Sequence, residues 1–172
     1  IGGLPGRLEA TGRGVAAAAR LAAERILGKP LKGVSVAVQG FGNVGRWTAA
    51  FLSQAGARVV AVGNVGGAVR NPKGLDIGRL FEHAPGRDDP VAGFPGGEAI
   101  SNGELLALDV DVLVPAAVER AVTRENAGSV RARCVIEGAN DPVTAEAEET
   151  LVSRGTVVLP DFFCNSGGVI AS

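Results

Sequence analysis

The sequence predicts an α/β fold in which a doubly wound, mostly parallel sheet carries helices on both faces. Short runs rich in valine, isoleucine and leucine alternate with longer segments whose apolar residues recur at helical spacing. A glycine-rich turn joins one of these runs to the helix that follows it, as in a βαβ unit. The chain of 172 residues is long enough to form one domain of this kind.

The first βαβ unit lies in the first third of the chain. A helix is expected over 11–27, where apolar residues recur at helical spacing and Gly28 supplies a stop signal. The β-branched run at 34–38 predicts a buried strand, because parallel strands are covered on both faces. A second helix at 43–55 and a second strand at 58–62 complete the unit, and its crossover is expected to be right-handed.

The rest of the chain continues the alternation with weaker signals. Two helical pieces are expected over 116–130, with Thr123 as an N-cap, and a last helix is expected to begin at Asp141, with Pro142 in its first turn. The other expected elements are a turn-rich stretch at 63–74, a short helix at 75–84, a loop with three prolines at 85–97, and strands at 111–114, 134–136 and 156–159.

Composition and charge argue against several classes of function. The net charge of −1 gives no reason to expect nucleic acid or an acidic membrane surface as a partner. No apolar run reaches the roughly 20 residues of a membrane-spanning helix. Cys134 and Cys164 have no metal-ligand spacing with His83. We therefore expect buried thiols in a reducing cytoplasm, and no metal.

The start of the chain has neither the charged segment nor the apolar core of a signal peptide. The chain also contains no methionine, even at its first position. These features predict that residues 1–172 are one domain processed or excised from a longer protein.

A G-x-G-x-x-G motif spans residues 40–45, between the strand that ends near Gln39 and the helix that begins at Asn43. In this Rossmann-type arrangement, Gly40 allows the tight turn out of the strand. Gly42 lets a pyrophosphate approach the backbone, and Gly45 lets the helix pack closely against the strand. The helix N-terminus presents N–H groups and partial positive charge to the phosphates. The motif therefore predicts a dinucleotide site, the alternative being an ordinary glycine-rich turn.

The acid that usually receives the ribose 2′-hydroxyl at the end of the second strand is missing. No Asp or Glu occurs over 25–75, and Asn64 stands where the acid is expected. An asparagine bonds a hydroxyl without repelling a 2′-phosphate, so both NAD and NADP are allowed. Affinity for the phosphate would need Arg70 or Lys73 to reach it, the alternative being that both are solvated loop charges.

Seven blocks of the sequence resemble the cofactor domain of glutamate dehydrogenases, within the family of glutamate, leucine, phenylalanine and valine dehydrogenases. They run in the family's order from one end of the chain to the other, at 7–15, 39–45, 71–76, 114–117, 137–140, 159–161 and 165–169. The blocks at 71–76 and 137–140 resemble the glutamate branch more than the leucine or phenylalanine branch.

The resemblance implies roles for individual residues. The residues expected at the pyrophosphate are Gly40, Phe41, Gly42, Asn43, Val44 and Gly45. Those expected at the nicotinamide and its ribose are Arg7, Thr11, Ala116, Ala117, Asn140 and Asn165. Val169 and Ser172 match positions that touch the amino-acid substrate, although Val169 taken alone would be interpreted as a core residue.

Three departures from the family pattern bear on these roles. Gly63-Asn64-Val65 stands where the family often has Ser-Asp-Ser, which weakens the case for NAD preference. Asp141 stands in place of the family's glycine and would add negative charge near the ribose, and Ser166 replaces a usual alanine.

The resemblance implies the cofactor half of an enzyme that oxidatively deaminates L-glutamate to 2-oxoglutarate and ammonia, with hydride transfer to NAD or NADP. The family's catalytic lysine and aspartate lie in an N-terminal domain, and no lysine here matches, so no catalytic residue is assigned and the isolated chain is expected to be inactive. The expected partners are a dinucleotide and an amino acid, in a homo-oligomeric parent. The alternatives are a non-catalytic dinucleotide-binding module and a leucine or phenylalanine dehydrogenase.

Overall fold

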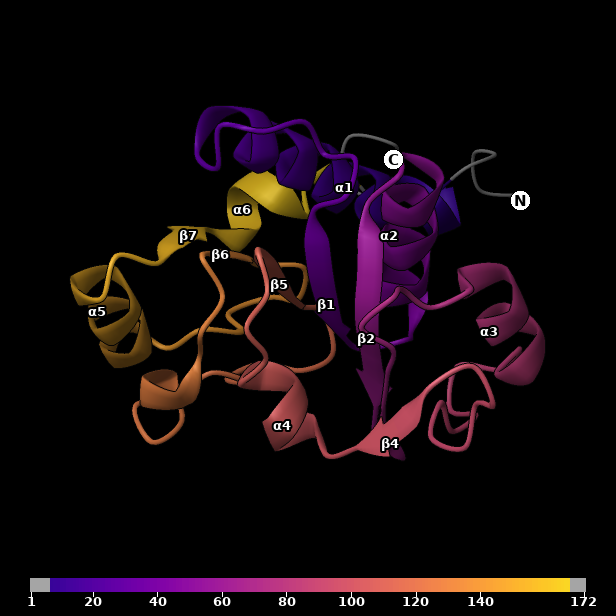
Figure 1. The fold of residues 1–172 in the computed structure, drawn as a ribbon. Coiled ribbons are helices and arrows are strands. Elements are labelled where there is room, and N and C mark those ends of the chain that lie inside the picture. The colour runs from indigo at the N-terminus through magenta and orange to yellow at the C-terminus, as the bar shows by residue number, and fades with distance from the viewer. Residues whose placement is uncertain (1–6, 168–172) are drawn as a thin grey trace, which may run out of the picture.

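A seven-stranded sheet lies at the centre of the computed structural model, which describes residues 7–167. Its strands are β1 (Ser35–Gln39), β2 (Arg58–Asn64), β3 (Gly67–Arg70), β4 (Glu98–Ile100), β5 (Val112–Pro115), β6 (Cys134–Ile136) and β7 (Val157–Leu159). The strand order is β4-β3-β2-β1-β5-β6-β7, and only the pairs β2–β3 and β3–β4 are antiparallel. The sheet is therefore mostly parallel, with an antiparallel edge (Figure 1).

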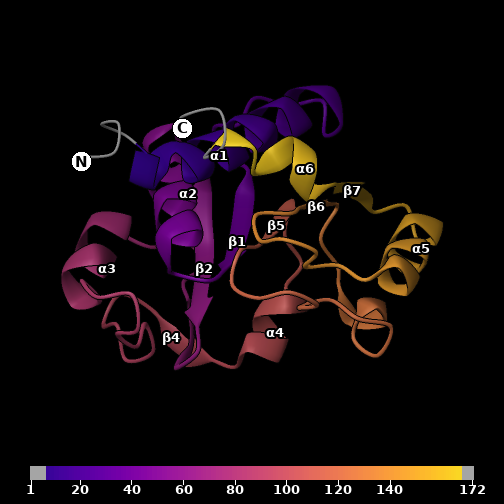
Figure 2. The same cartoon turned by 180° about the vertical axis from the view of Figure 1, so that it is seen from behind.

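Helices cover both faces of this sheet. They are α1 (Arg7–Arg25), α2 (Asn43–Gln54), α3 (Ile77–His83), α4 (Asn102–Leu106), the 3-10 helix η1 (Ala127–Ser129), α5 (Ala145–Ser153) and α6 (Asp161–Cys164). One core cluster joins the sheet to α1, α2 and α3, and the other joins it to α4, η1 and α5. Along β1, Val36 and Val38 belong to the first cluster and Ala37 to the second, as the alternation of a strand requires. Figures 1 and 2 show α3 and α5 at opposite ends of the molecule.

Two glycines bring α1 unusually close to its neighbours. A Cβ on Gly12 would lie 2.6 Å from the Cβ of Trp47 on α2, and a Cβ on Gly14 would lie 3.0 Å from the carbonyl oxygen of Cys164 on α6. Thr11 sits beside these contacts. The glycines therefore bring the N-terminal half of α1 to the edge of the sheet where the candidate site lies.

The strand order reverses at β1, which has β2 on one side and β5 on the other. The chain leaves the ends of these strands in opposite directions, and this is where ligands of open α/β sheets bind. The predicted fold class, a doubly wound α/β fold of Rossmann type, is thus confirmed.

Several boundaries differ from the sequence-based expectations. The first helix covers Arg7–Arg25 rather than 11–27, and the third covers Ile77–His83 rather than 75–84. The turn-rich stretch at 63–74 contains β3, because its glycines form the hairpin in which Asn64 pairs with Gly67. The elements β4, α4 and α6 were not predicted, since each has only three to five residues.

The two helical pieces expected over 116–130 are wrong. Only η1 is helical there, because the backbone is bonded to a neighbouring loop: Arg120 N donates to Asp141 O at 2.8 Å and Val122 N donates to Pro142 O at 2.9 Å. Asp141 is not an N-cap, since its φ is +44° and an N-cap residue is extended. Thr144 caps α5 instead.

Candidate functional site

A hollow of about 1170 Å³ opens at the carboxyl edge of the sheet. We distinguish two rims around it: a glycine rim, made of residues 40–44, Asn64 and the 84–89 loop, and an acidic rim, made of 116–120, 137–141, Asp161 and Asn165. Each rim contains lining residues and residues that stand behind them. The hollow is lined by Thr11, Gly40, Phe41, Gly42, Asn43, Val44, Asn64, Val65, Arg87, Asp88, Ala116, Ala117, Val118, Glu119, Gly138, Ala139, Asn140 and Asn165.

Contacts within the protein require two of the three glycines of the motif, and the third is not required by them. Gly40 has φ +113°, and a Cβ there would lie 2.7 Å from the carbonyl group of Ala116 at the end of β5. A Cβ on Gly45 would lie 1.9 Å from the carbonyl oxygen of Gly40, so helix and turn could not pack. A Cβ on Gly42 would meet only Nε of Arg87, at 3.9 Å. Position 42 therefore has no side chain facing the hollow, although no contact in the described protein would prevent one there.

Helix α2 points its N-terminus at the same space. Its N-cap is Gly42, and no side chain caps its first turn. The unbonded N–H groups at the start of a helix bind anions, assisted by the helix dipole. The bare Gly42 and the uncapped helix together form a cradle that suits a phosphate group.

Asn64 lies at this cradle, but its side chain is engaged within the protein. Its Nδ2 donates to the carbonyl oxygen of Asp89 at 2.6 Å, and its Oδ1 accepts from the backbone N–H of Gly66 at 3.0 Å. The residue is buried. It fixes the 84–89 loop to the end of β2.

Arg87 is the cation of the glycine rim, and sequence reasoning missed it. It is exposed, lines the hollow, and has no ion pair with another residue of the described range 7–167. The loop around it contains three prolines and has no periodicity, so nothing local indicated its position. Its position follows from long-range bonds that hold the 84–89 loop, and the sequence contains no signal for those bonds.

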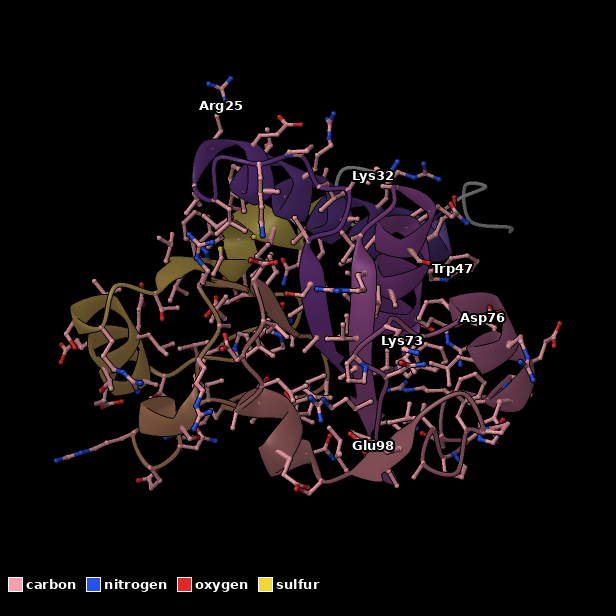
Figure 3. All side chains as sticks on the ribbon, viewed as in Figure 1. Arg25, Lys32, Trp47, Lys73, Asp76 and Glu98 are labelled. Carbon is pink, nitrogen blue, oxygen red and sulfur yellow. The ribbon has the colours of Figure 1, made fainter. Side chains whose placement is uncertain are left out.

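The cations that the sequence suggested lie elsewhere. Arg70 stands opposite Ala61 in the β2–β3 pair, and Ala61 lies three residues before Asn64 on β2. The Arg70 guanidinium bonds the Glu98 carboxylate at 2.9 Å. Lys73 lies further back still, because the neighbouring backbone groups of Asn71 and Leu75 bond the early residues 59–60 of β2. Figure 3 labels Lys73 and also Glu98 on β4. Neither cation lines the hollow.

Hydrogen bonds to carboxylates and between side-chain amides hold the acidic rim together. Glu137 Oε2 accepts from Asp161 N at 2.8 Å, and Asp161 Oδ2 accepts from Asp141 N at 2.9 Å. Asn165 Nδ2 donates to Asn140 Oδ1 at 2.9 Å. These bonds join the loop after β6 to α6.

Glu137 is a buried carboxyl within the acidic rim. Burial raises its pKa to about 7, and the nearby carboxylates of Asp161, Glu148 and Asp141 act in the same direction, while the hydrogen bond from Asp161 N opposes them. Its protonation is therefore expected to change near neutral pH.

The predicted site residues fall into three groups. Those brought together around the hollow are Thr11, Gly40, Phe41, Gly42, Asn43, Val44, Asn64, Ala116, Ala117, Asn140 and Asn165. Gly45 lies behind the turn and supports it. Arg7 opens α1, but its side chain lies outside the described part, as do Val169 and Ser172.

Neither cysteine offers a reactive thiol, because burial raises the pKa of Cys134 and of Cys164 to about 12. Within residues 7–167, no cluster of three or more His, Cys, Asp or Glu side chains could hold a metal ion. In the same part of the chain, no helix has both the length and the apolar character needed to cross a membrane.

Known proteins match along the whole chain. The family model described as "Glutamate/Leucine/Phenylalanine/Valine dehydrogenase" covers residues 2–172. The NADP-specific glutamate dehydrogenase of Saccharolobus shibatae is 44% identical over 172 residues, and the glutamate dehydrogenase of Thermotoga maritima is 49% identical over 173 residues. These matches cover 100% of this chain but only 40% and 41% of the relatives.

Solved structures agree. The hetero-hexameric glutamate dehydrogenase of Thermus thermophilus, in a leucine-bound form, aligns with a TM-score of 0.85 at 35% identity, over 99% of this chain and 40% of that one. The glutamate dehydrogenase of Peptoniphilus asaccharolyticus aligns with a TM-score of 0.78 at 34% identity, over 97% and 38%. The chain spans about 40% of the length of these relatives and belongs to the glutamate, leucine, phenylalanine and valine dehydrogenase family.

Proposed function

We propose that this chain is the cofactor-binding domain of an NAD(P)-dependent glutamate dehydrogenase, which oxidatively deaminates L-glutamate to 2-oxoglutarate and ammonia. One observation carries the proposal. Gly42 has no neighbour that forbids a side chain, yet it is bare where an uncapped helix N-terminus faces a large hollow at the switch point of the sheet. A pyrophosphate that approaches the backbone explains all of these features.

The residues of the glycine rim would hold the phosphates. The turn at 40–42 leaves room for them, and the first turn of α2, from Asn43 onward, supplies N–H donors. Gly45 keeps the helix tight against the turn, so the donors are held in place before the ligand arrives. The hollow is larger than a typical small-ligand pocket, as an extended dinucleotide needs.

The acidic rim would hold the nicotinamide half. A nicotinamide held there would supply the acceptor for the hydride from the α-carbon of the amino acid. Asn140 and Asn165 are bonded to each other at this rim and would offer amide groups to a ribose and a carboxamide, and Thr11 also lines the hollow. Ala116 and Ala117 leave space beside them. The resemblance adds Arg7 to this end, with Val169 and Ser172 at the amino-acid substrate.

We infer that NADP binds at least as well as NAD. Asn64 carries no charge to repel a 2′-phosphate, and Arg87 supplies a positive charge on the same rim. The relative from Saccharolobus shibatae is named NADP-specific, and it is 44% identical. An Arg–phosphate contact is charge-assisted and screened by salt, so binding of NADP should weaken more with ionic strength than binding of NAD.

Chemistry on glutamate would need groups that this chain does not supply. The reaction requires a base and a closed cleft, and the chain spans about 40% of the relatives that carry out the complete reaction. We therefore propose that the catalytic groups, and the contacts of a homo-oligomer in the cytoplasm, belong to the longer protein. The purified chain should give no protein-dependent NADPH from glutamate.

Parallel calorimetric titrations of the chain with NAD and NADP, at low and moderate salt, test the proposal. We expect both to bind, NADP no more weakly than NAD, and the NADP affinity to fall more steeply with salt. Binding of neither dinucleotide would overturn the assignment. A preference for NAD greater than about a hundredfold, or about 2.7 kcal/mol, would overturn only the role given to Asn64 and Arg87.

A further inference from the structure

We propose that Arg46 is a positioning residue for cofactor choice: from the first turn of α2 it holds the 84–89 loop against the glycine-rich turn, and so keeps Arg87 on the hollow. The inference rests on the proposed function, because the ligand that it serves is the 2′-phosphate of NADP. It concerns a residue that touches the loop and not the ligand.

The guanidinium of Arg46 contacts four backbone carbonyl oxygens. Nε donates to Phe41 at 3.1 Å, within the glycine-rich turn. Nη1 donates to Pro85 at 2.9 Å, and Nη2 donates to Ala84 at 3.1 Å and to Gly86 at 2.9 Å. Arg46 thus ties three consecutive carbonyls of the loop to the turn that forms the cradle.

Two aromatic rings fix the guanidinium itself. Its Cζ lies 5.1 Å from the ring centre of Phe41 and 5.3 Å from that of Phe81, and the two rings meet edge to face at 5.4 Å. Trp47 extends the cluster to Phe81 at 5.7 Å, and Figure 3 shows Trp47 between α2 and α3. We call the contacts of the Arg46 guanidinium with these rings and carbonyl oxygens the clamp. The clamp is therefore part of the packing between α2 and α3.

The far end of the loop is tied separately. Asn64 Nδ2 holds the carbonyl of Asp89 at 2.6 Å, and Asp89 Oδ2 accepts from Gly86 N at 2.6 Å. Arg87 lies between the two ties, with its Nε 3.9 Å from the place where a Cβ on Gly42 would be. Fixing the backbone on both sides limits the positions that its side chain can reach, which lowers the entropy lost on binding a phosphate.

Only arginine has the geometry for this clamp. Its planar fork of five N–H groups reaches carbonyls on two segments at once, whereas a lysine ammonium is a compact charge with three donors. Without the clamp, the loop would keep its tie to Asn64 but lose its hold on the glycine-rich turn. Arg87 could then pair with the carboxylate of its neighbour Asp88 or Asp89 instead of lying beside Gly42.

The test compares NADP and NAD affinities for the chain and for Arg46→Met, Arg46→Lys, Arg87→Met and the double variant Arg46→Met/Arg87→Met. Arg79→Met, at an exposed arginine of the neighbouring α3, is the matched control. We expect Arg46→Met to weaken NADP binding roughly tenfold and NAD binding less than about threefold. Arg46→Lys should show most of the same loss, and Arg79→Met none.

The double variant separates positioning from direct charge. If Arg46 acts through Arg87, then adding Arg46→Met to Arg87→Met leaves the NADP-to-NAD ratio unchanged. Hydrogen exchange of the 84–89 amides should rise in both Arg46 variants but not in Arg87→Met. A ratio that still falls in the double variant, equal losses for both dinucleotides, or unchanged exchange would overturn the inference. Failure of the unmutated chain to bind any dinucleotide would instead overturn the proposed function.

Discussion

The two rims of the hollow lie at the same edge of one sheet but are built with opposite chemistry. The glycine rim is held by an arginine and an asparagine that donate to carbonyl oxygens, and it presents Arg87 and the neighbouring Asp88 to the hollow. The acidic rim is held by Glu137 and Asp161, which accept from backbone N–H groups. The two rims therefore differ in how they are held together: side-chain donors bond carbonyl oxygens at the glycine rim, and carboxylates accept from backbone N–H groups at the acidic rim.

Gly42 in the glycine rim and Gly45 behind it should respond differently to the same substitution. Gly42→Val places a side chain in the hollow at an ordinary φ of −77°, so we expect loss of dinucleotide binding by a factor of about a hundred or more with little change in stability. Gly45→Val drives a Cβ into the carbonyl of Gly40, and we expect it to destabilise the fold by several kcal/mol. Calorimetric titration and chemical denaturation of both variants measure the two effects.

The contrast between these variants identifies the cradle. If Gly42→Val binds as well as the unmutated chain, the phosphates lie elsewhere and the motif was misinterpreted. Gly128→Val is the control, because nothing lies within 4 Å of the position of its Cβ and it is remote from the glycine rim.

Asn64→Asp tests how the glycine rim tolerates negative charge. The aspartate would place a carboxylate where Nδ2 now donates to Asp89 O at 2.6 Å, and it would repel a nearby phosphate. Repulsion between charges about 4 Å apart near a surface is about 4 kcal/mol before screening, and a third of that is roughly tenfold in affinity. We therefore expect NADP to weaken about tenfold or more and NAD clearly less.

Asn64→Ala separates the two effects of that change. It removes the tie to Asp89 without adding charge, so it should weaken both dinucleotides modestly and shift their ratio less than Asn64→Asp does. If parallel titrations give the two variants equal NADP-to-NAD affinity ratios, then the position of the 84–89 loop decides cofactor choice, and the charge at residue 64 does not.

The same contrast explains what sequence could predict. The glycine motif is local, so β1, the turn and α2 followed from spacing, and the reasons for Gly40 and Gly45 can be verified in single contacts. The loop that carries Arg87 is held by three long-range bonds from Arg46, and such bonds produce no periodic pattern in the sequence. The stretch 116–130 has good helical residues, but its backbone groups are bonded to the 141–142 loop. Tertiary bonds that cross between loops were the part that could not be predicted.

The acidic rim should respond to pH through Glu137. Its pKa is raised from 4.5 to about 7, so the folded protein binds this proton more tightly than the unfolded chain. The resulting stability is fully present below about pH 4.5 and is lost as pH rises through about 7. Glu137→Gln should remove this dependence. Melting temperatures between pH 5 and 8 should fall more for the unmutated chain than for Glu137→Gln.

A matched control keeps this measurement specific. Glu149→Gln changes an exposed carboxylate on α5 and should leave the pH slope of the unmutated chain in place. A slope that Glu137→Gln retains would mean that another group of the acidic rim titrates in this range.

The smallest expected effect comes from strain in the acidic rim. Asp141 and Arg120 both have positive φ, +44° and +54°, and Arg120 N donates to Asp141 O, so the two left-handed residues support each other. Such a conformation costs a non-glycine residue on the order of 1 kcal/mol, less for aspartate than for most. Asp141→Gly keeps the backbone N–H that donates to Asp161 Oδ2 and removes the strain. It also removes one negative charge from the set around Glu137, which lowers the pKa of that carboxyl. Glycine gains more freedom in the unfolded chain, which offsets part of the benefit. We therefore expect Asp141→Gly to raise the free energy of unfolding by only about 0.5 kcal/mol, measured by chemical denaturation near neutral pH.

Asp141→Ala removes the same charge but keeps the Cβ, so it should be less stable than Asp141→Gly by roughly 1 kcal/mol. Equal stabilities for the glycine and alanine variants would show that the positive φ carries no cost here and that charge alone decides the effect.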